Sequence, residues 1–162
     1  MKQKKVAIIM GSRSDLAEVE KTAKVLSDLG IGYEMHIISA HRTPDTASGF
    51  AQRAEAEGFD VIIAAAGKAA HLAGVMAAGT VLPVIGIPMK TGDLGGMDSL
   101  LSTVQMPKGV PVATVAIGGA ENAAILAAQI LACSDNGLRA ALKEYRKKMA
   151  EEVAEADREL NK

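Results

Sequence analysis

The residues with the clearest chemical potential follow an apolar run in the first third of the chain. Ser39, Ala40, His41 and Arg42 stand in a row there, two positions before Pro44. An imidazole can carry a proton near neutral pH, and a guanidinium can hold a phosphate or carboxylate through two hydrogen bonds. From their spacing alone, a catalytic role and a purely structural role of His41 and Arg42 in the turn are equally supported. Our hypothesis is that His41 is an acid/base and that Arg42 holds an anionic group beside it.

A second polar set follows the first apolar run of the chain and consists of Gly11, Ser12, Ser14 and Asp15. Backbone N–H groups, hydroxyls and a helix start together suit a phosphate. Asp15 would repel a phosphate but can accept hydrogen bonds from ribose hydroxyls. The loop matches neither a Walker loop nor the dinucleotide fingerprint. Taken by itself, it is better interpreted as a plain capped turn.

A third set follows another apolar run and comprises Gly67, Lys68, Ala69, Ala70, His71 and Leu72. His71 has apolar neighbours, and this setting slightly favours a buried, hydrogen-bonded histidine over a catalytic one. His36 lies within an expected strand, where a structural role is strongly favoured.

Several classes of site find little support in the sequence. There is no His-x-x-x-His, no cysteine pair and no Gly-x-Ser-x-Gly, so we expect neither a metal centre nor a serine hydrolase. Cys133, the single cysteine, lies in an apolar helical pattern and is expected to be a buried thiol in a reducing cytoplasm. A cofactor-free acid/base reaction on a small phosphorylated substrate remains.

Composition and hydropathy also exclude some partners. The net charge is −1, and the aromatic residues are two Tyr and two Phe without Trp, so a base-stacking surface for nucleic acid is not expected. No apolar run approaches the roughly 20 residues that span a bilayer, and we expect no membrane association.

The elements that must position these side chains alternate along the chain. Continuous apolar runs predict strands over 6–10, 33–38, 61–66, 81–87 and 110–117. Helical spacing predicts helices over 16–29, 44–57, a short stretch ending near 79, 98–104 and 123–132. This alternation predicts an α/β fold: a three-layer, flavodoxin-like, doubly wound parallel sheet of five strands in one domain over 1–162. The three polar sets would then meet at the carboxyl edge of the sheet.

The tail over 138–160 has a different pattern. Apolar residues recur there every three or four positions with charges between them, which predicts a long amphipathic helix. Such a helix could pack on its own domain. It is longer than one face of a small sheet requires, and we therefore slightly favour packing of its far half on a neighbouring subunit.

Several motifs occur in one order along the chain. They are Gly11-Ser12-x-Ser14-Asp15, Ser39-Ala40-His41-Arg42-Thr43-Pro44, Ala69-Ala70-His71-Leu72, Met97-Asp98-Ser99-Leu100-Leu101-Ser102, Val104-Gln105-Met106-Pro107 and the run from Asn122 to Leu131. With them, residues 5–155 resemble the PurE family, the N5-carboxyaminoimidazole ribonucleotide (N5-CAIR) mutases of purine biosynthesis.

The resemblance implies a cytoplasmic homo-octamer of flavodoxin-like subunits with active sites between subunits. It implies conversion of N5-CAIR to 4-carboxy-5-aminoimidazole ribonucleotide (CAIR) through CO2, without metal or organic cofactor. By position, Ser12, Asp15 and Arg42 would bind the ribonucleotide, with Gly11, Ser14, Ser39 and Ala40 beside them. His41 would be the general acid/base. His71 and the 67–72 loop would line the pocket for base and carboxylate, and the glycine-rich 92–96 segment is a candidate cover.

Two departures from the family pattern stand out. Lys68 occupies a place where mutases commonly read Gly-Gly-Ala-Ala-His-Leu, and the related AIR carboxylases, which use CO2 directly, often carry a basic residue near it. Direct carboxylation of aminoimidazole ribonucleotide (AIR) therefore remains an alternative, and a non-catalytic nucleotide-binding domain is a remote one. The second departure is the segment 90–96, which is more polar than expected.

Overall fold

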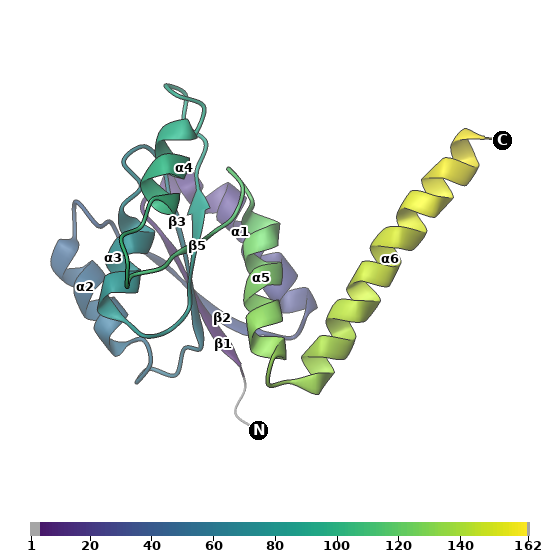
Figure 1. Cartoon of the computed structure of the whole chain (residues 1–162), viewed down its shortest axis with the longest axis horizontal. Helices are drawn as coiled ribbons and strands as arrows, with labels where there is room; N and C mark the ends of the chain where they lie inside the picture. The colour runs from purple at the N-terminus through teal and green to yellow at the C-terminus, as the bar shows by residue number, and fades with distance from the viewer. Residues whose placement is uncertain (1–3, 162) are drawn as a thin grey trace.

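The structure is a computed structural model that describes residues 4–161, and a parallel sheet lies at its centre (Figure 1). The sheet has five strands in the order β2-β1-β3-β4-β5. The strands are β1 (Lys5–Met10), β2 (Gly32–Ile37), β3 (Val61–Ala66), β4 (Val84–Pro88) and β5 (Ala113–Thr114). All of the pairings are parallel. The predicted doubly wound α/β sheet is confirmed.

Helices cover both faces of this sheet. They are α1 (Leu16–Asp28), α2 (Pro44–Arg53), α3 (Leu72–Gly79), α4 (Met97–Val104), α5 (Ala120–Ala132) and α6 (Asn136–Leu160), with a short 3-10 helix at Arg13–Asp15 before α1. α1 and α5 pack together over one face, and α2 and α3 over the other. The buried side chains of α5 are mainly alanines, which let the helix lie close to the strands.

The register of the sheet brings the strand ends together. Met10, the last residue of β1, is level with Ile37 at the end of β2 and with Ala65 near the end of β3. The three polar loops therefore start at the same height on the carboxyl edge of the sheet, as the sequence predicts.

The fifth strand is shorter than predicted. A strand over 110–117 is expected from its apolar residues, whereas only Ala113–Thr114 pair with β4. Pro111 has no N–H to donate to a ladder. The chain beyond β5 still follows the sheet edge, because Val115 N donates to Gly86 O at 3.1 Å and Gly118 N to Pro88 O at 2.9 Å.

The end of the chain leaves the body. Figure 1 shows α6 running outward from the base of α5, with the C-terminus far from the sheet. Leu138 is buried, whereas Met149, Val153 and Leu160 are 50%, 72% and 85% exposed. The long helix is confirmed, and the apolar residues of its far half have no covering layer from the described part of the chain.

The expectation of a buried Cys133 is wrong, because this residue is exposed. The covered face of α5 includes Ala127, Ala128, Leu131 and Ala132. Cys133 follows immediately after this face and is rotated away from it, so an apolar neighbourhood in sequence did not mean burial. Within residues 4–161, no helix combines the length and apolarity that crossing a membrane requires.

Candidate active site

A cavity of about 490 Å³ opens at the carboxyl edge of the sheet, where the loops after β1, β2 and β3 meet. Thirteen of the fourteen predicted site residues line it: Gly11, Ser12, Ser14, Asp15, Ser39, Ala40, His41, Arg42, Gly67, Lys68, Ala69, His71 and Leu72. The structure thus brings together residues that lie up to 61 positions apart in the sequence.

Ala70 is the predicted site residue that does not line the cavity. Its side chain is buried in the protein. Two further residues, Ala66 and Thr91, line the cavity without having been singled out. Thr91 follows β4, and the end of β4 pairs with the end of β3. The loop after β4 therefore starts at the same edge of the sheet as the loop after β3, and this placement could have predicted that Thr91 lines the cavity. Its Oγ1 atom is buried without a hydrogen-bond partner in the described chain.

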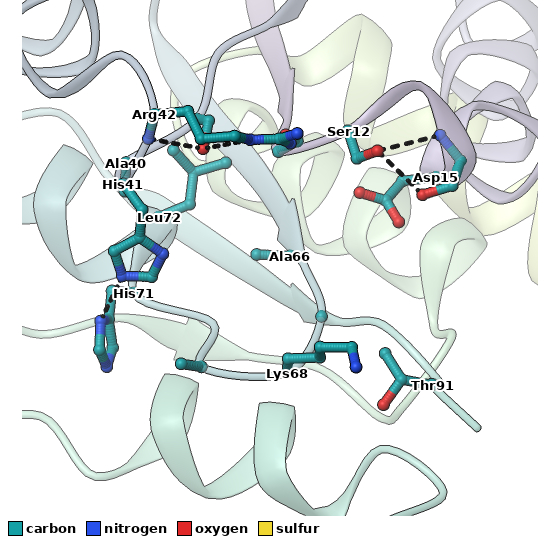
Figure 2. A pocket seen from close by; sticks show the side chains of 15 residues that line it. Ser12, Asp15, Ala40, His41, Arg42, Ala66, Lys68, His71, Leu72 and Thr91 are labelled. Carbon is teal, nitrogen blue, oxygen red and sulfur yellow. Dashed lines mark hydrogen bonds between the residues drawn. The ribbon is translucent and has the colours of Figure 1, made fainter. Parts of the chain in front are cut away.

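Two histidines from different loops face each other at one end of the cavity. His41 Nε2 and His71 Nδ1 are 2.9 Å apart, and the rings are nearly perpendicular at 78° (Figure 2). One of these nitrogens donates a hydrogen bond and the other accepts it. Both residues are exposed, so the interpretation of His71 as a buried structural histidine is wrong. We call this part of the cavity the histidine end.

The sequence accounts for how these two histidines are placed. His41 lies in the turn between β2 and α2, where Thr43 N donates to Ser39 O at 2.9 Å, and Pro44 then starts α2. His71 immediately precedes α3, and its backbone carbonyl accepts the first hydrogen bond of that helix from Val75 N at 2.9 Å. Each imidazole is thus carried by a short turn between a strand and a helix.

Arg42 crosses from the second loop to the first. Its guanidinium donates to Gly11 O at 2.9 Å and more weakly to Ser39 Oγ at 3.4 Å. Ser39 Oγ also accepts from the backbone N–H of Arg42 at 3.1 Å. These bonds hold the arginine against the start of the first loop, and its remaining N–H groups can still bind an anion.

The first loop supplies hydroxyls and a carboxylate. Ser12 Oγ accepts from Ser14 N at 3.3 Å and from Ser14 Oγ at 3.0 Å, so the serine caps the short 3-10 helix. Asp15 makes no side-chain cap bond to α1, and its carboxylate lines the cavity. Burial raises the pKa of the Asp15 carboxyl above its ordinary value. We call this part of the cavity, with Ser12, Asp15 and Arg42, the polar end.

Lys68 lines the cavity between the two ends, and its ammonium is engaged. Lys68 Nζ lies 2.6 Å from Asp93 Oδ2, in the segment between β4 and α4. The neighbouring carboxylate raises the pKa of Lys68, and the ammonium lowers the pKa of Asp93. Among the described residues, Lys68 is the only non-glycine with a positive φ, of 55°. This left-handed conformation costs an L-residue about 1–2 kcal/mol.

Metal ligands do not cluster in the described part of the chain. No group of three His, Cys, Asp or Glu side chains is arranged there to hold a metal ion. The arrangement has two imidazoles, which can carry a proton, at one end of a cavity and hydrogen-bonding groups suited to a sugar phosphate at the other.

Comparisons with known proteins identify the family of this chain. The family model described as AIR carboxylase matches residues 5–152. The chain is 57% identical over 145 residues to the N5-carboxyaminoimidazole ribonucleotide mutase of Pyrococcus abyssi, which covers 90% of this chain and 83% of that relative. It is 51% identical over 153 residues to the enzyme of the same name from Escherichia coli K12, covering 93% and 90%.

A solved structure agrees with these sequence relatives. The crystal structure of Treponema denticola PurE superposes with a TM-score of 0.88 at 31% identity, over 99% of this chain and 100% of that one. The match extends over nearly the whole length of this chain, so it includes the long C-terminal helix.

Proposed function

This chain belongs to the AIR carboxylase family, and we propose from that premise that it is an N5-CAIR mutase. The enzyme converts N5-CAIR to CAIR in purine biosynthesis. Relatives that bear this name cover most of the chain at about half or more identity. The observation that carries the assignment to a site is the His41–His71 contact at 2.9 Å in a cavity that also holds Ser12, Asp15 and Arg42.

The reaction transfers protons within its steps but neither consumes nor releases a proton overall. Loss of the N-carboxylate as CO2 leaves the exocyclic nitrogen in need of a proton, and AIR results. The nucleophilic C4 carbon of AIR then attacks the trapped CO2, and the new C–C bond leaves C4 with a hydrogen that must depart. A single imidazole can give the first proton and take the second, so it returns to its starting state.

The histidine contact supports His41 as this proton carrier. When His41 Nε2 donates its hydrogen to His71 Nδ1, the basic nitrogen of His41 is Nδ1. Within residues 4–161, Nδ1 of His41 has no hydrogen-bond partner, so it can face the substrate. For the cycle to balance, Nδ1 carries a hydrogen at the start, gives it to the exocyclic nitrogen, and then takes the hydrogen from C4. His71 orients the ring and stabilises its charged form.

The polar end would bind the ribonucleotide. Arg42 and the N–H groups of the first loop suit the phosphate, and the Asp15 carboxylate can accept hydrogen bonds from ribose hydroxyls. The loop after β3 would lie against the base and the CO2. A cover over the site would keep CO2 from diffusing away, and we propose that the Gly92–Gly96 segment takes part in it.

One observation favours a second candidate, AIR carboxylase, which makes the same product from AIR and CO2 directly. Lys68 supplies a cation at the cavity wall, where it could hold a carboxylate or a hydrated form of CO2. Its pairing with Asp93 weakens this alternative, because an engaged ammonium is less available to a ligand.

A product assay decides between the two reactions. Purified protein is supplied either with N5-CAIR or with AIR at low CO2, and CAIR is followed. We expect rapid turnover of N5-CAIR and slow carboxylation of AIR. Turnover of AIR at low CO2 without activity on N5-CAIR would refute the mutase assignment.

We also propose that the chain works as a cytoplasmic homo-oligomer, and we take an octamer as the working hypothesis. Exposed apolar side chains support association. They gather on α4 with Met97, Leu101 and Val104, and at Leu94 shortly before it. Others lie on β2 with Tyr33 and Ile37, and on the far half of α6 with Met149, Val153 and Leu160. A cytoplasmic location suits a chain whose one cysteine is free.

The far half of α6 would pack on a neighbouring subunit. A helix of 25 residues is about 37 Å long, and only its beginning is anchored on the body through Leu138 and Leu142. Truncation after Gly137 should lower the number of subunits per particle, taken as the light-scattering mass divided by the mass of one truncated subunit, whereas truncation after Asn161 serves as the control. An unchanged number of subunits for the first truncation would refute this packing.

A further inference from the structure

Lys68 and Asp93, from two different loops, form an ion pair beside the cavity. Lys68 follows β3, and Asp93 lies in the segment 90–95 between β4 and α4. Their charged groups are 2.6 Å apart. A cation in one loop therefore meets an anion in the other.

The segment 90–95 is anchored at both of its ends. Met89 N donates to Ala66 O at 2.9 Å, so the chain leaves β4 at a fixed point. The buried Ser99 hydroxyl lies 2.7 Å from Met89 O and 2.9 Å from Gly96 O and shares its one hydrogen between these carbonyls, which fixes the start of α4. The segment is thus a short loop with a narrow base.

Between these anchors, one polar side-chain interaction ties the segment to the rest of the protein, beside the packing of Thr91 near Gly67. Within residues 4–161, the Lys68–Asp93 pair is the only side-chain hydrogen bond or ion pair that joins residues 90–95 to another part of the chain. Gly92 and Gly95 within the segment leave its backbone free to move. The pair is thus the polar contact that can hold the part of the segment beyond Thr91.

The pair lies beside the cavity. Lys68 and Thr91 both line it, and Figure 2 shows the Lys68 side chain extended toward Thr91 and away from the two histidines. Because the ammonium is turned to the β4–α4 segment, its direct contact is with the cover of the cavity rather than with the proton carrier.

We propose that Lys68 is a positioning residue, whose ion pair with Asp93 fastens the β4–α4 segment beside the cavity and slows the escape of CO2 between decarboxylation and recarboxylation. The proposal rests on the proposed mutase function. Lys68 and Asp93 are both largely exposed, and exposed pairs contribute little to global stability. The effect therefore falls on the local opening of the segment.

The first test measures CO2 escape directly. Unlabelled N5-CAIR is converted in buffer that contains ¹³C-bicarbonate and carbonic anhydrase, and the ¹³C fraction of CAIR is read by mass spectrometry. Removing the pair by Asp93→Asn or Lys68→Gly should raise this fraction about two- to fivefold. The double variant should give a ¹³C fraction no higher than that of either single variant. The charge exchange Lys68→Glu with Asp93→Lys should bring the ¹³C fraction back toward that of the wild type.

The matched control is Glu57→Gln, which removes the exposed Arg53–Glu57 pair on the α2 side of the molecule. It should leave the labelled fraction unchanged. A labelled fraction in Asp93→Asn equal to that of the wild type would overturn the proposal.

The second test does not depend on activity. Amide hydrogen exchange of residues 91–95 should be about two- to fivefold faster in Asp93→Asn than in the wild type, and unchanged exchange would overturn the fastening role. Faster exchange without extra label would overturn the role in CO2 retention. If the wild type does not convert N5-CAIR at all, the proposed function fails, while the exchange measurement still tests the fastening.

Discussion

The histidine end and the polar end of the cavity hold their side chains in different ways. At the histidine end, a single hydrogen bond joins His41 to His71. At the polar end, Arg42 donates to two acceptors, Gly11 O and Ser39 Oγ, and Ser12 Oγ accepts two hydrogen bonds from Ser14. The polar end is a network of several bonds, and the histidine end is one contact.

This contrast separates two tasks. A binding surface for a sugar phosphate gains from many fixed donors, because each one lost costs only part of the affinity. A proton carrier must change its charge during the reaction, and few fixed partners leave it free to do so. Substitutions at the histidine end should therefore lower kcat, whereas those at the polar end should raise KM.

The largest effect is expected from His41→Asn. If His41 carries the proton as proposed, its loss should lower kcat by about 10²- to 10⁴-fold, the usual contribution of general acid/base catalysis, with little change in KM. Steady-state formation of CAIR measures both constants. His36→Asn, which removes a histidine on β2 away from the cavity, is the control. A kcat within tenfold of the wild type would mean that His41 is not the proton carrier.

Arg42→Ala should produce the opposite split. Loss of a charge-assisted hydrogen bond to a phosphate costs about 1.5–3 kcal/mol, so KM should rise about 10- to 100-fold with a smaller change in kcat. The neighbouring, exposed Arg13 does not line the cavity, and Arg13→Ala should leave KM nearly unchanged. A lower kcat with an unchanged KM would contradict the assignment of substrate binding to the polar end.

Asp15→Asn should have a smaller effect on binding, with a KM about fivefold higher if the carboxylate accepts a ribose hydroxyl. As the pH is lowered, protonation of the Asp15 carboxylate should remove the acceptor and raise the wild-type KM. Burial raises the pKa of this carboxyl, so the rise should begin at a higher pH than an ordinary aspartate would give. The KM of the variant should lack this rise. Equal pH profiles would refute the ribose contact.

The same raised pKa gives a sign for stability. The folded chain keeps the Asp15 proton to a higher pH than the unfolded chain, so stability falls as pH rises from the ordinary value of about 3.9 through the raised one. Asp15→Asn should therefore be more stable than the wild type at pH 7, with the difference vanishing below about pH 3. Urea unfolding at both pH values measures this.

The smallest effect is expected at Lys68, between the two ends. Lys68→Gly removes the cost of a left-handed lysine but adds freedom to the unfolded chain, so it should raise the free energy of unfolding by about 0.5 kcal/mol. The midpoint of urea unfolding measures the change. A variant that is clearly less stable would mean that the Lys68 side chain supports the fold as well as the segment beside the cavity.

The sheet and most of the cavity wall could be predicted from the sequence, because both depend on strong local patterns. Buried parallel strands such as 61–66 are continuous apolar runs, and the polar residues that follow them share one edge. The fifth strand was predicted too long, because its length depends on the missing N–H of Pro111 and on pairing with β4. Burial of Cys133 was misjudged because it depends on helix phase rather than on neighbouring residue types.

Pairings between distant side chains were beyond the sequence pattern. The sequence placed His41 and His71 at one edge but could not indicate that the two rings would touch, since this depends on the exact path of two turns. Thr91 was overlooked for a related reason. The segment after β4 is polar and rich in glycine, and nothing in it distinguishes a residue that faces the cavity from one that faces water.

The level ends of β1, β2 and β3 also affect how the protein acquires its activity. Each wall of the cavity is a loop that follows a different strand, and these strands pair in parallel. Parallel neighbours are joined by long crossover connections, so two strands can pair only after the segment between them has folded back. No local hairpin can build part of the site early. During refolding from denaturant, catalytic activity should therefore return only with the complete sheet, later than helical structure measured by circular dichroism.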